Sequence, residues 1–240
     1  ELGAGAGRNT PRYHGFDKVV LLDYSISQLQ QAQNRLGRDP RYIYVAADIY
    51  RLPFTAGLFD AATMIRTLHH MADARLALKQ VRRVMQLGGV FVLEFANKLN
   101  LKAILRYWLG KQSWNPFSLE PIEFVELNFD FHPRYIRSLL SENQFLIQRQ
   151  LTVSHFRIPF LKRVVPLKWL IRMDAAAQLT GNWWQLTPSV FVRSQAQGED
   201  SKLADDAFFS CPICGSTVLE ETQAMVTCKD CSRRWKIQDG

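Results

Sequence analysis

The first seven residues, Glu1-Leu2-Gly3-Ala4-Gly5-Ala6-Gly7, constrain the fold more than any other stretch of the chain. Each glycine lacks a Cβ, so the backbone can turn sharply and a ligand can approach it closely. A glycine loop between a strand and a helix also directs free backbone N–H groups at that ligand. The nicotinamide and flavin pattern G-x-G-x-x-G does not fit, because its third glycine, counted from Gly3, would fall on Arg8.

A glycine loop of this kind follows the first strand of a nucleotide-binding sheet. Glu1 would then be the last residue of that strand, and natural domains rarely begin there. We therefore expect this sequence to be a fragment that lacks at least one strand and a helix.

The next ninety residues alternate between strand and helix patterns. Ser25 and Gln28 form a capping box that opens a helix with apolar residues at helical spacing, and Gly37 ends it. The expected strands are residues 19–22, 42–46, 61–65 and 90–95, and a second helix spans residues 73–86 before Gly88-Gly89. This alternation predicts an α/β fold in which helices cover both faces of a mostly parallel sheet.

Asp23 ends the first of these strands, about 20 residues after the glycine loop, where an acidic residue can accept hydrogen bonds from ribose hydroxyls. The alternative is that Asp23 only helps to cap the following helix. The glycine loop upstream favours the ribose role.

The spacing E-x-G-x-G-x-G in residues 1–7 resembles the first motif of class I S-adenosylmethionine (SAM) methyltransferases. Three later features agree with that family in order and spacing: Asp23, Asp48 followed by Pro53-Phe54, and Phe59-Asp60 before the next strand. The resemblance covers residues 1–97. It implies a Rossmann-like class I methyltransferase with a mostly parallel seven-stranded sheet, its first strand truncated here, and SAM as the cofactor.

The same resemblance assigns roles around the cofactor. Asp48 would accept a hydrogen bond from the adenine amino group, and Ile49 would pack on the ring. The expected cofactor-binding residues are Glu1, Gly3, Ala4, Gly5, Gly7, Asp23, Tyr24, Asp48, Ile49 and Arg66.

The stretch Leu68-His69-His70-Met71 resembles the branch of the family that methylates small molecules, including quinone precursors and other lipids. Amide- and adenine-N6-methylating relatives carry Asn/Asp-Pro-Pro-Tyr/Phe where this chain has Arg66-Thr67-Leu68-His69. Enzymes that methylate cytosine C5 use a cysteine nucleophile, and all four cysteines here lie in the tail. Neither of these nucleic-acid chemistries is therefore expected, although a nucleic-acid partner is not excluded. A base is needed only where the acceptor starts protonated. His69 and His70 are the candidate bases, with packed loop residues as the alternative, and His132 and His155 have weaker claims.

The second half of the methyltransferase domain is less regular. Residues 97–132 are expected to be an insertion that covers the substrate and to include a helix from Leu101, and residues 133–140, 145–153 and 187–192 read as helix, strand and strand. Residues 157–173 mix apolar and basic side chains around Pro166, which must break a helix. This segment is either a substrate lid, a membrane-surface helix or an amphipathic helix packed on the domain.

The net charge of +8 permits contact with phosphates or with an anionic membrane, so a weak membrane-surface contact is one expectation for partners. No apolar run approaches the roughly 20 residues that a membrane-spanning helix requires.

All four cysteines lie in the last thirty residues, in two C-x-x-C pairs that thirteen residues separate. This spacing predicts a zinc site of four thiolates, with iron as the main competitor, and a reducing compartment such as the cytoplasm. The expected ligands are Cys211, Cys214, Cys228 and Cys231.

The tail also resembles the small zinc-binding activator protein that partners several tRNA and release-factor methyltransferases. Phe209-x-Cys-Pro-x-Cys and Trp235-Lys-Ile-Gln-Asp-Gly240 carry this resemblance, and a generic zinc ribbon remains the alternative. We therefore expect the ribbon to dock on the methyltransferase domain through Phe208, Phe209 and Trp235, which could instead fill the ribbon's own core.

These features predict a methyltransferase domain over residues 1–194, a linker over 195–207 and a zinc ribbon over 208–240. The expected function is SAM-dependent methylation of a small or lipid-like acceptor with a zinc module in cis. The alternative is a non-catalytic SAM-binding protein whose ribbon contacts RNA or a protein partner, which Arg233, Arg234 and Lys236 support.

Overall fold

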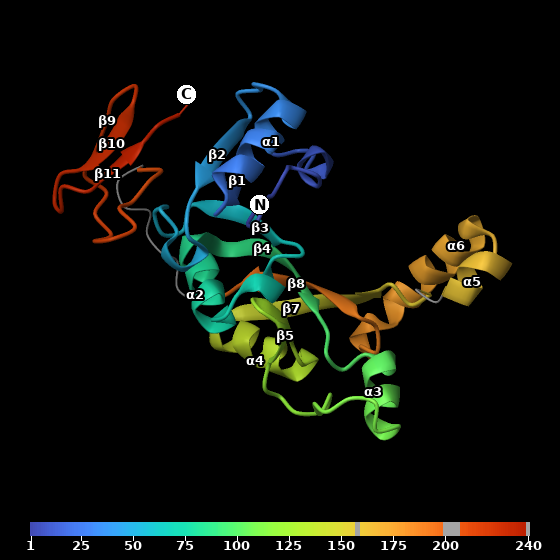
Figure 1. Cartoon of the computed structure of the whole chain (residues 1–240). Helices are drawn as coiled ribbons and strands as arrows, with labels where there is room; N and C mark the ends of the chain where they lie inside the picture. The colour runs from blue at the N-terminus through green and yellow to red at the C-terminus, as the bar shows by residue number, and fades with distance from the viewer. Residues whose placement is uncertain (157–158, 199–206, 239–240) are drawn as a thin grey trace. The chain divides into compact units, whose positions relative to one another are not determined.

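The computed structural model describes residues 1–156, 159–198 and 207–238 (Figure 1). It divides into two compact units. Unit 1 comprises Glu1–Ala62, Lys79–Gly89 and Gly198–Gly240, and unit 2 comprises Thr63–Leu78 and Val90–Gln197. No helix of the described residues is long and apolar enough to cross a membrane.

Unit 1 is built around the parallel strands β1 (Val19–Asp23) and β2 (Tyr42–Ala46), which α1 (Ile26–Leu36) connects. Leu2 forms a parallel bridge with Leu22, so the residues before the glycine loop run beside β1. The short helices η1 (Thr10–Arg12) and η2 (Ile49–Arg51) complete this part. The buried core between β1 and α1 consists of Ala4, Val19, Leu21, Leu29 and Ala32.

The local signals in the sequence predicted these elements closely. The Ser25 side chain accepts a hydrogen bond from Gln28 N at 3.4 Å, which confirms the helix start. Gly37 has φ of +79° and its N–H donates to Gln33 O, which confirms the helix end.

The larger sheet has the order β3-β4-β8-β7. Its strands are β3 (Phe59–Met64), β4 (Met85–Ala96), β7 (Phe145–Val153) and β8 (Ser189–Ala196), and β3 and β4 each begin in unit 1 and end in unit 2. Strand β8 pairs antiparallel with both β4 and β7, so this sheet is mixed and not purely parallel. Phe91 and Phe145, with ring centroids 5.1 Å apart, pack in the core of unit 2.

One predicted boundary is wrong. The second helix, α2 (Ala74–Val84), ends before Gln86, and β4 already begins at Met85. Gly88 and Gly89 therefore lie inside the strand and do not cap the helix. The reason is close packing, because a Cβ on Gly89 would lie 3.0 Å from Gln86 O and 3.1 Å from Asp60 O.

Unit 2 contains the remaining helices and a small hairpin. Its elements besides the large sheet are η3 (Leu68–His70), α3 (Leu101–Trp108), β5 (Ile122–Val125), β6 (Asn128–Asp130), α4 (Pro133–Glu142), α5 (Pro159–Val164), α6 (Leu167–Gln178) and η4 (Leu179–Asn182). Pro166 is the N-cap of α6, which confirms that it breaks the amphipathic segment. Arg157, where that segment was expected to begin, lies outside the described residues.

The ribbon in unit 1 is a three-stranded antiparallel sheet of order β11-β10-β9. Its strands are β9 (Leu219–Glu221), β10 (Met225–Cys228) and β11 (Arg234–Lys236). Strand β8 runs to Ala196, and the described part of the chain continues to residue 198. The division of the chain into domain, linker and ribbon stays a prediction.

Residues 207–210 bind to the segment after η2 within unit 1. Phe209 forms an antiparallel bridge with Phe54, flanked by hydrogen bonds from Ser210 N to Pro53 O (3.0 Å) and from Thr55 N to Phe208 O (3.3 Å). The Phe209 ring stacks on Phe54, and the Phe208 ring meets Phe54 edge-on, each at 5.8 Å. Two of the three expected docking aromatics thus make the contact, whereas Trp235 lies in β11 opposite Val226.

Replacing Phe209 by alanine should destabilise unit 1, because the substitution removes the stack on the buried Phe54 ring. Since Phe209 is only half-buried, we expect a loss of about 2 kcal/mol, below the range for a fully buried phenylalanine. Urea unfolding of Phe209→Ala measures this, with the exposed Phe124 replaced by alanine as control. Equal stability of the two variants would contradict the contact.

Candidate functional site

The glycine loop of unit 1 has the backbone geometry that the sequence suggested. Gly3, Gly5 and Gly7 have φ of +68°, +52° and +66°, a region that residues with a Cβ rarely adopt. At Gly7 the loop also touches α1, because a Cβ there would lie 3.0 Å from Leu36 Cδ1 and 3.2 Å from Ala32 Cβ. Substitution at Gly7 would therefore displace the loop from the helix.

Asp23, the last residue of β1, holds the loop from the other side. Its Oδ2 accepts a hydrogen bond from Gly5 N at 2.8 Å, and its Oδ1 accepts one from Ser25 N at 2.9 Å. Each carboxylate oxygen can accept a second hydrogen bond, so two hydroxyl groups can still bind in a bidentate manner. The N-cap residue of α1 is Ser25, and Asp23 holds the backbone N–H of that residue.

Glu1 and Tyr24 flank this centre. The Glu1 carboxylate accepts hydrogen bonds from Thr10 Oγ1 at 2.5 Å and from the Tyr13 hydroxyl at 3.4 Å, so it ties the loop to η1. The Tyr24 side chain is 83% exposed beside Asp23 and is open to a ligand.

Asp48 follows β2 and begins η2. Its Oδ1 accepts a hydrogen bond from Tyr50 N at 2.9 Å, and no other partner contacts this carboxylate among the described residues. Ile49 is buried beside it. Ala47 N donates to Asp23 O at 3.1 Å, so unit 1 brings the loop, Asp23 and Asp48 together at the carboxyl ends of two parallel strands.

Arg66, His69 and His70 belong to unit 2. Arg66 has φ of +58°, an unusual conformation for a residue with a Cβ, and its N–H donates to Glu94 Oε2 at 2.7 Å. Glu94 is buried in β4 and also accepts a hydrogen bond from the Ser189 hydroxyl. This carboxylate therefore fixes the backbone after β3.

The two histidines differ in burial and in hydrogen bonding. Burial, followed by the charges of His70 and Arg66, lowers the pKa of His69 to about 4, so His69 is neutral and weakly basic at pH 7. His70 is exposed, and its Nδ1 lies 3.0 Å from Leu127 O. Because a carbonyl can only accept, neutral His70 carries its proton on Nδ1 and leaves the Nε2 lone pair open.

A second polar cluster in unit 2 surrounds Lys98, whose side chain is buried. Its Nζ donates to Ser118 Oγ at 2.8 Å and to Glu120 O at 2.6 Å, and burial lowers its pKa. Burial raises the pKa of Asp130 to about 6, and the Lys98 charge opposes that rise. The segment over residues 97–132 thus packs around an internal lysine.

His132 and His155 have structural roles. The His132 Nδ1 accepts a hydrogen bond from Arg134 N at 3.1 Å and caps α4. Burial, followed by the charges of Lys98 and two arginines, lowers its pKa to about 4. His155 Nδ1 lies 3.0 Å from Asp174 Oδ1.

The four cysteines form a compact cluster in the ribbon, where all four sulfur atoms lie within 4.8 Å of one another. The Cys211–Cys231 and Cys214–Cys228 sulfur pairs are each 3.6 Å apart. Tetrahedral zinc with Zn–S bonds of about 2.3 Å places its sulfurs about 3.8 Å apart, so this donor set fits zinc. Cys211 Sγ also accepts hydrogen bonds from the N–H groups of Ile213 and Cys214, both at 3.4 Å.

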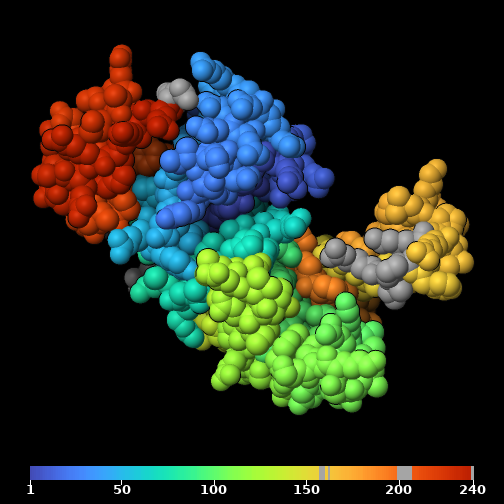
Figure 2. All heavy atoms as spheres, in the orientation of Figure 1, coloured from blue at the N-terminus to red at the C-terminus, as the bar shows by residue number. Residues whose placement is uncertain are grey.

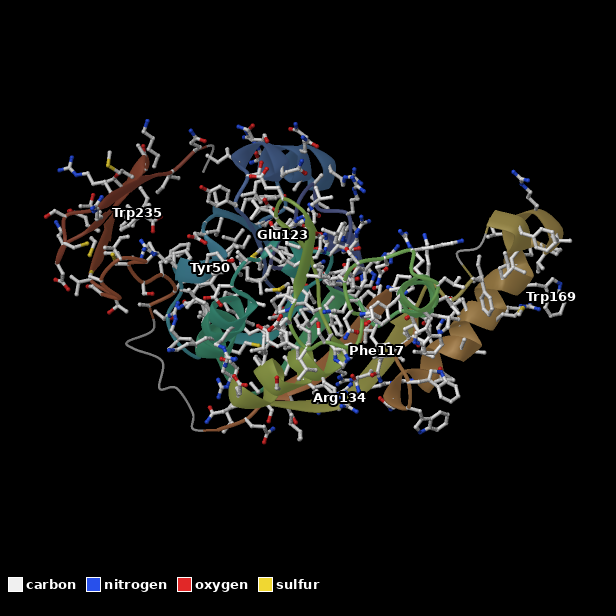
Figure 3. The ribbon with its side chains drawn as sticks, turned by 60° about the horizontal axis from the view of Figure 1, so that its bottom comes forward. Tyr50, Phe117, Glu123, Arg134, Trp169 and Trp235 are labelled. Carbon is white, nitrogen blue, oxygen red and sulfur yellow. The ribbon has the colours of Figure 1, made fainter. Side chains whose placement is uncertain are left out.

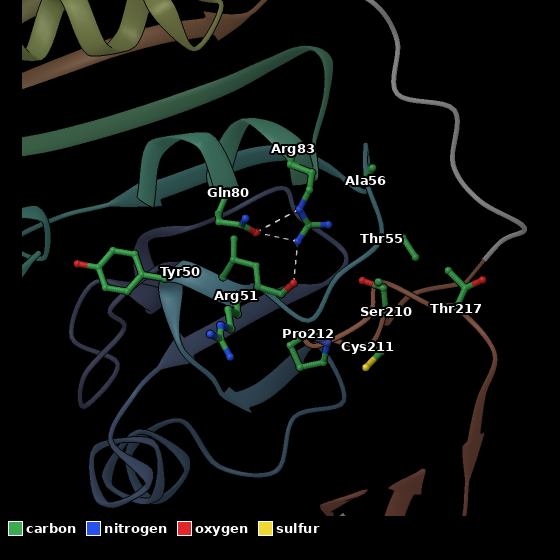
Figure 4. Close-up of a pocket in the computed structure, with 12 residues that line it drawn as sticks. Tyr50, Arg51, Thr55, Ala56, Gln80, Arg83, Ser210, Cys211, Pro212 and Thr217 are labelled. Atoms are coloured by element: carbon green, nitrogen blue, oxygen red, sulfur yellow. Dashed lines mark hydrogen bonds between the residues drawn. The ribbon is translucent and has the colours of Figure 1, made fainter. Parts of the chain in front are cut away.

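A pocket of about 390 Å³ lies between η2, the end of α2 and the first cysteine pair, all within unit 1 (Figure 4). The Arg83 guanidinium donates to Leu52 O at 2.7 Å and to Phe54 O at 2.8 Å. Figure 4 shows Arg83 also bonded to Gln80. Arg83 and the ribbon therefore hold the same stretch, residues 52–55, from two sides.

Comparison with known proteins agrees with this geometry. Residues 1–93 match the model of a methyltransferase domain family. This stretch of the chain is therefore similar to a methyltransferase domain.

Relatives of this part of the chain include two proteins named as quinone methyltransferases. A demethylmenaquinone methyltransferase of Clavibacter sepedonicus is 33% identical over 98 residues, which are 40% of each chain. The ubiquinone/menaquinone biosynthesis C-methyltransferase UbiE of Hahella chejuensis is 32% identical over 108 residues, 42% of this chain and 43% of that protein. The chain thus spans less than half the length of these relatives.

A similar solved structure comes from the complex between the Haloferax volcanii Trm112 methyltransferase activator and its partner methyltransferase. The TM-score is 0.56 with 15% sequence identity, over 82% of this chain and 81% of that chain. At this identity the likeness shows the fold alone.

Sequence reasoning missed Glu94 and the Lys98–Asp130 pair. Glu94 interrupts the otherwise apolar run Val90-Phe91-Val92-Leu93-Glu94-Phe95, and a charge inside a buried strand is a signal for a buried polar contact. Lys98 and Asp130 carry no such signal, since thirty-one intervening residues separate them and only the tertiary fold brings them together.

Replacing Asp23 by alanine should weaken binding of SAM and S-adenosylhomocysteine by roughly ten- to a hundredfold, because it removes the bidentate acceptor and frees the Gly5 N–H. Calorimetric titration measures this. Asp17, an exposed acid in the same unit, is the control when replaced by alanine. An unchanged affinity of Asp23→Ala for SAM would contradict the assignment of Asp23 to the ribose.

The lowered pKa of His132 makes stability depend on pH. Its folded pKa of about 4 lies below the value of 6.5 for an unperturbed histidine, so its contribution is complete above pH 6.5 and is lost as pH falls through 4. Asparagine can cap α4 without titrating, so His132→Asn should lose less stability than the parent between pH 7 and pH 4. Urea unfolding at both pH values measures this loss, with the exposed His14→Asn as control. Equal losses of stability in the parent and in both variants would contradict the prediction.

Proposed function

We propose that this protein transfers a methyl group from SAM to a small or lipid-like acceptor. The observation that carries the proposal is the Asp23 carboxylate, bonded to Gly5 N and Ser25 N with acceptor capacity left for a ribose. Asp48 supplies an acceptor for the adenine amino group, and Ile49 an apolar surface for the ring.

SAM supplies an activated methyl carbon on a sulfonium, so the protein contributes mainly position and alignment. The residues in unit 1 bind and orient the nucleoside. Positive charge disappears as the methyl group moves, so the site needs no group that stabilises an anion. A side chain is needed only as a general base, to remove a proton from the acceptor.

We assign the role of general base to His70. Its Nδ1–H is committed to Leu127 O, which leaves Nε2 as the acceptor for a proton from a hydroxyl or an acidic C–H of the acceptor. His69, with its pKa near 4, is too weak a base at neutral pH. The quinone-methylating relatives support a quinone-type acceptor, and its reduced hydroquinone form carries an ionisable ring hydroxyl that would need such a base.

His70→Gln should lower the rate of methyl transfer by about 10²- to 10⁴-fold, whereas His69→Gln should leave the pH profile of the rate unchanged. The assay follows radiolabelled methyl transfer from SAM to the reduced, hydroquinone form of demethylmenaquinone-type acceptors and to phenolic acceptors. Equal rates in both variants would reject His70 as the base and leave methyl transfer itself standing.

We further propose that the ribbon binds zinc through Cys211, Cys214, Cys228 and Cys231 in a reducing compartment, the cytoplasm. The sulfur geometry supports this, and a module of about thirty residues has too little core to fold without a metal. The zinc-bound ribbon would then fix residues 48–55, the segment proposed to bind adenine. Residues 207–210 form hydrogen bonds with Pro53 and Thr55, a few residues after Asp48. The activator complex among the structural neighbours is a parallel in which a separate protein binds a methyltransferase.

Cys214→Ser should therefore release the metal, lower the melting temperature and weaken SAM binding together. Elemental analysis, thermal unfolding and calorimetry measure the three effects, with Ser216→Ala as a control in the same loop. Zinc loss with unchanged SAM affinity would make the ribbon an independent module.

The alternative, a non-catalytic SAM-binding protein whose ribbon contacts RNA or protein, rests on the exposed Arg233, Arg234 and Lys236. Binding of SAM without transfer to any lipid, quinone, RNA or protein fraction would favour it. Transfer to a quinone or lipid fraction would exclude it.

A further inference from the structure

Helices α5 and α6 of unit 2 expose a large apolar surface. Figure 3 shows the Trp169 ring projecting outward from α6. Trp169 is 58% exposed and Phe160 69%, and the Trp183 and Trp184 pair that follows η4 is 78% and 56% exposed. The other exposed apolar side chains here are Val164, Leu167, Ile171, Met173, Leu179 and Leu186.

A second exposed apolar face lies close by in the same unit. Helix α3 and the turn after it expose Leu101, Leu105, Trp108 and Leu109, and Figure 2 shows this segment, in green, at the molecular surface (Figure 2). Leu101 N donates to Leu186 O at 2.8 Å, and Asn97 Nδ2 donates to the carbonyls of Gln185 and Thr187. The start of α3 is therefore bonded to the stretch that follows the tryptophan pair.

The charge of the chain is concentrated in the same two segments. Residues 97–119 and 156–186 contain nine of the 30 basic residues and one of the 22 acidic residues. Lys98 among them is buried, and the exposed ones among the described residues are Lys102, Arg106, Lys111, Arg163, Lys168 and Arg172. The two segments account for the whole net charge of +8, because the rest of the chain has 21 residues of each sign. The single acid, Asp174, accepts hydrogen bonds from His155 and Gln178.

We propose that this apolar and basic surface, formed by α3, α5, α6 and residues 183–186, docks on an anionic phospholipid bilayer. Tryptophan side chains prefer the boundary between headgroups and acyl chains, and lysine and arginine bind anionic headgroups. Arg172 lies over the Trp169 ring at 5.6 Å, so the two side chains can reach the same depth of the boundary. The elements would lie on the membrane surface without spanning it.

Charge complementarity favours an anionic bilayer as the partner of this surface. A second copy of the chain would bring two surfaces of the same sign together, which costs free energy. Closure over a bound acceptor would bury Arg163, Lys168 and Arg172, all of them exposed and without an acidic partner among the described residues. A bilayer surface accepts apolar and basic side chains at once.

The inference goes beyond the proposed function and is tested without methyl transfer. Flotation of the whole protein with phosphatidylcholine vesicles, with and without phosphatidylserine, should show binding only to the anionic vesicles. Lys168→Gln with Arg172→Gln should weaken that binding by about thirtyfold, since each surface charge contributes about 1 kcal/mol. The matched control, Arg35→Gln with Arg38→Gln in unit 1, should bind as the parent does.

Trp169→Ser should also weaken binding, with the exposed Phe124→Ser as its control. Melting temperatures equal to the parent's would show that these variants fold. Flotation independent of phosphatidylserine, equal binding by both charge variants, or a concentration-dependent dimer that the Trp169 variant abolishes would overturn the proposal.

Discussion

Two hydrogen bonds to one carboxylate hold together the part of unit 1 that is proposed to bind the cofactor. Asp23 accepts from Gly5 N and Ser25 N, so a single side chain ties the glycine loop to the end of β1 and to the start of α1. The loop can adopt its positive φ angles only at the glycines, and its contact with Ala32 and Leu36 requires that Gly7 lack a Cβ. The geometry of the proposed nucleoside site follows from these local constraints.

Other parts of the structure fix backbone segments by similar means. In unit 2 the buried Glu94 holds the N–H of Arg66 in an unusual conformation just before η3. In unit 1 Arg83 and residues 207–210 hold residues 52–55 from opposite sides. Because residues 52–55 continue from Asp48 and η2, the ribbon is linked through a few residues to the segment proposed to bind adenine.

Local patterns in the sequence predicted most of the elements. The boundaries of β2 and β7, the caps Ser25 and Gly37 and the break at Pro166 depend on neighbouring residues, so periodicity and capping chemistry were sufficient. Gly88-Gly89 misled the prediction because close approach to Asp60 O, a long-range contact, decides their conformation. The Lys98–Asp130 pair also depends on distant residues, and no spacing rule anticipates it. The sequence predicted Phe209 as a docking residue, but its partner Phe54 follows only from the tertiary fold.

The central claim is that SAM binds on the glycine loop, Asp23 and the segment that begins at Asp48. Hydrogen–deuterium exchange of the protein with and without SAM tests it most directly, since it reports on backbone N–H groups along the whole chain. The account predicts slower exchange over residues 3–7, 23–25 and 47–50 when SAM is present. Binding of SAM with no change in exchange over these residues would contradict it.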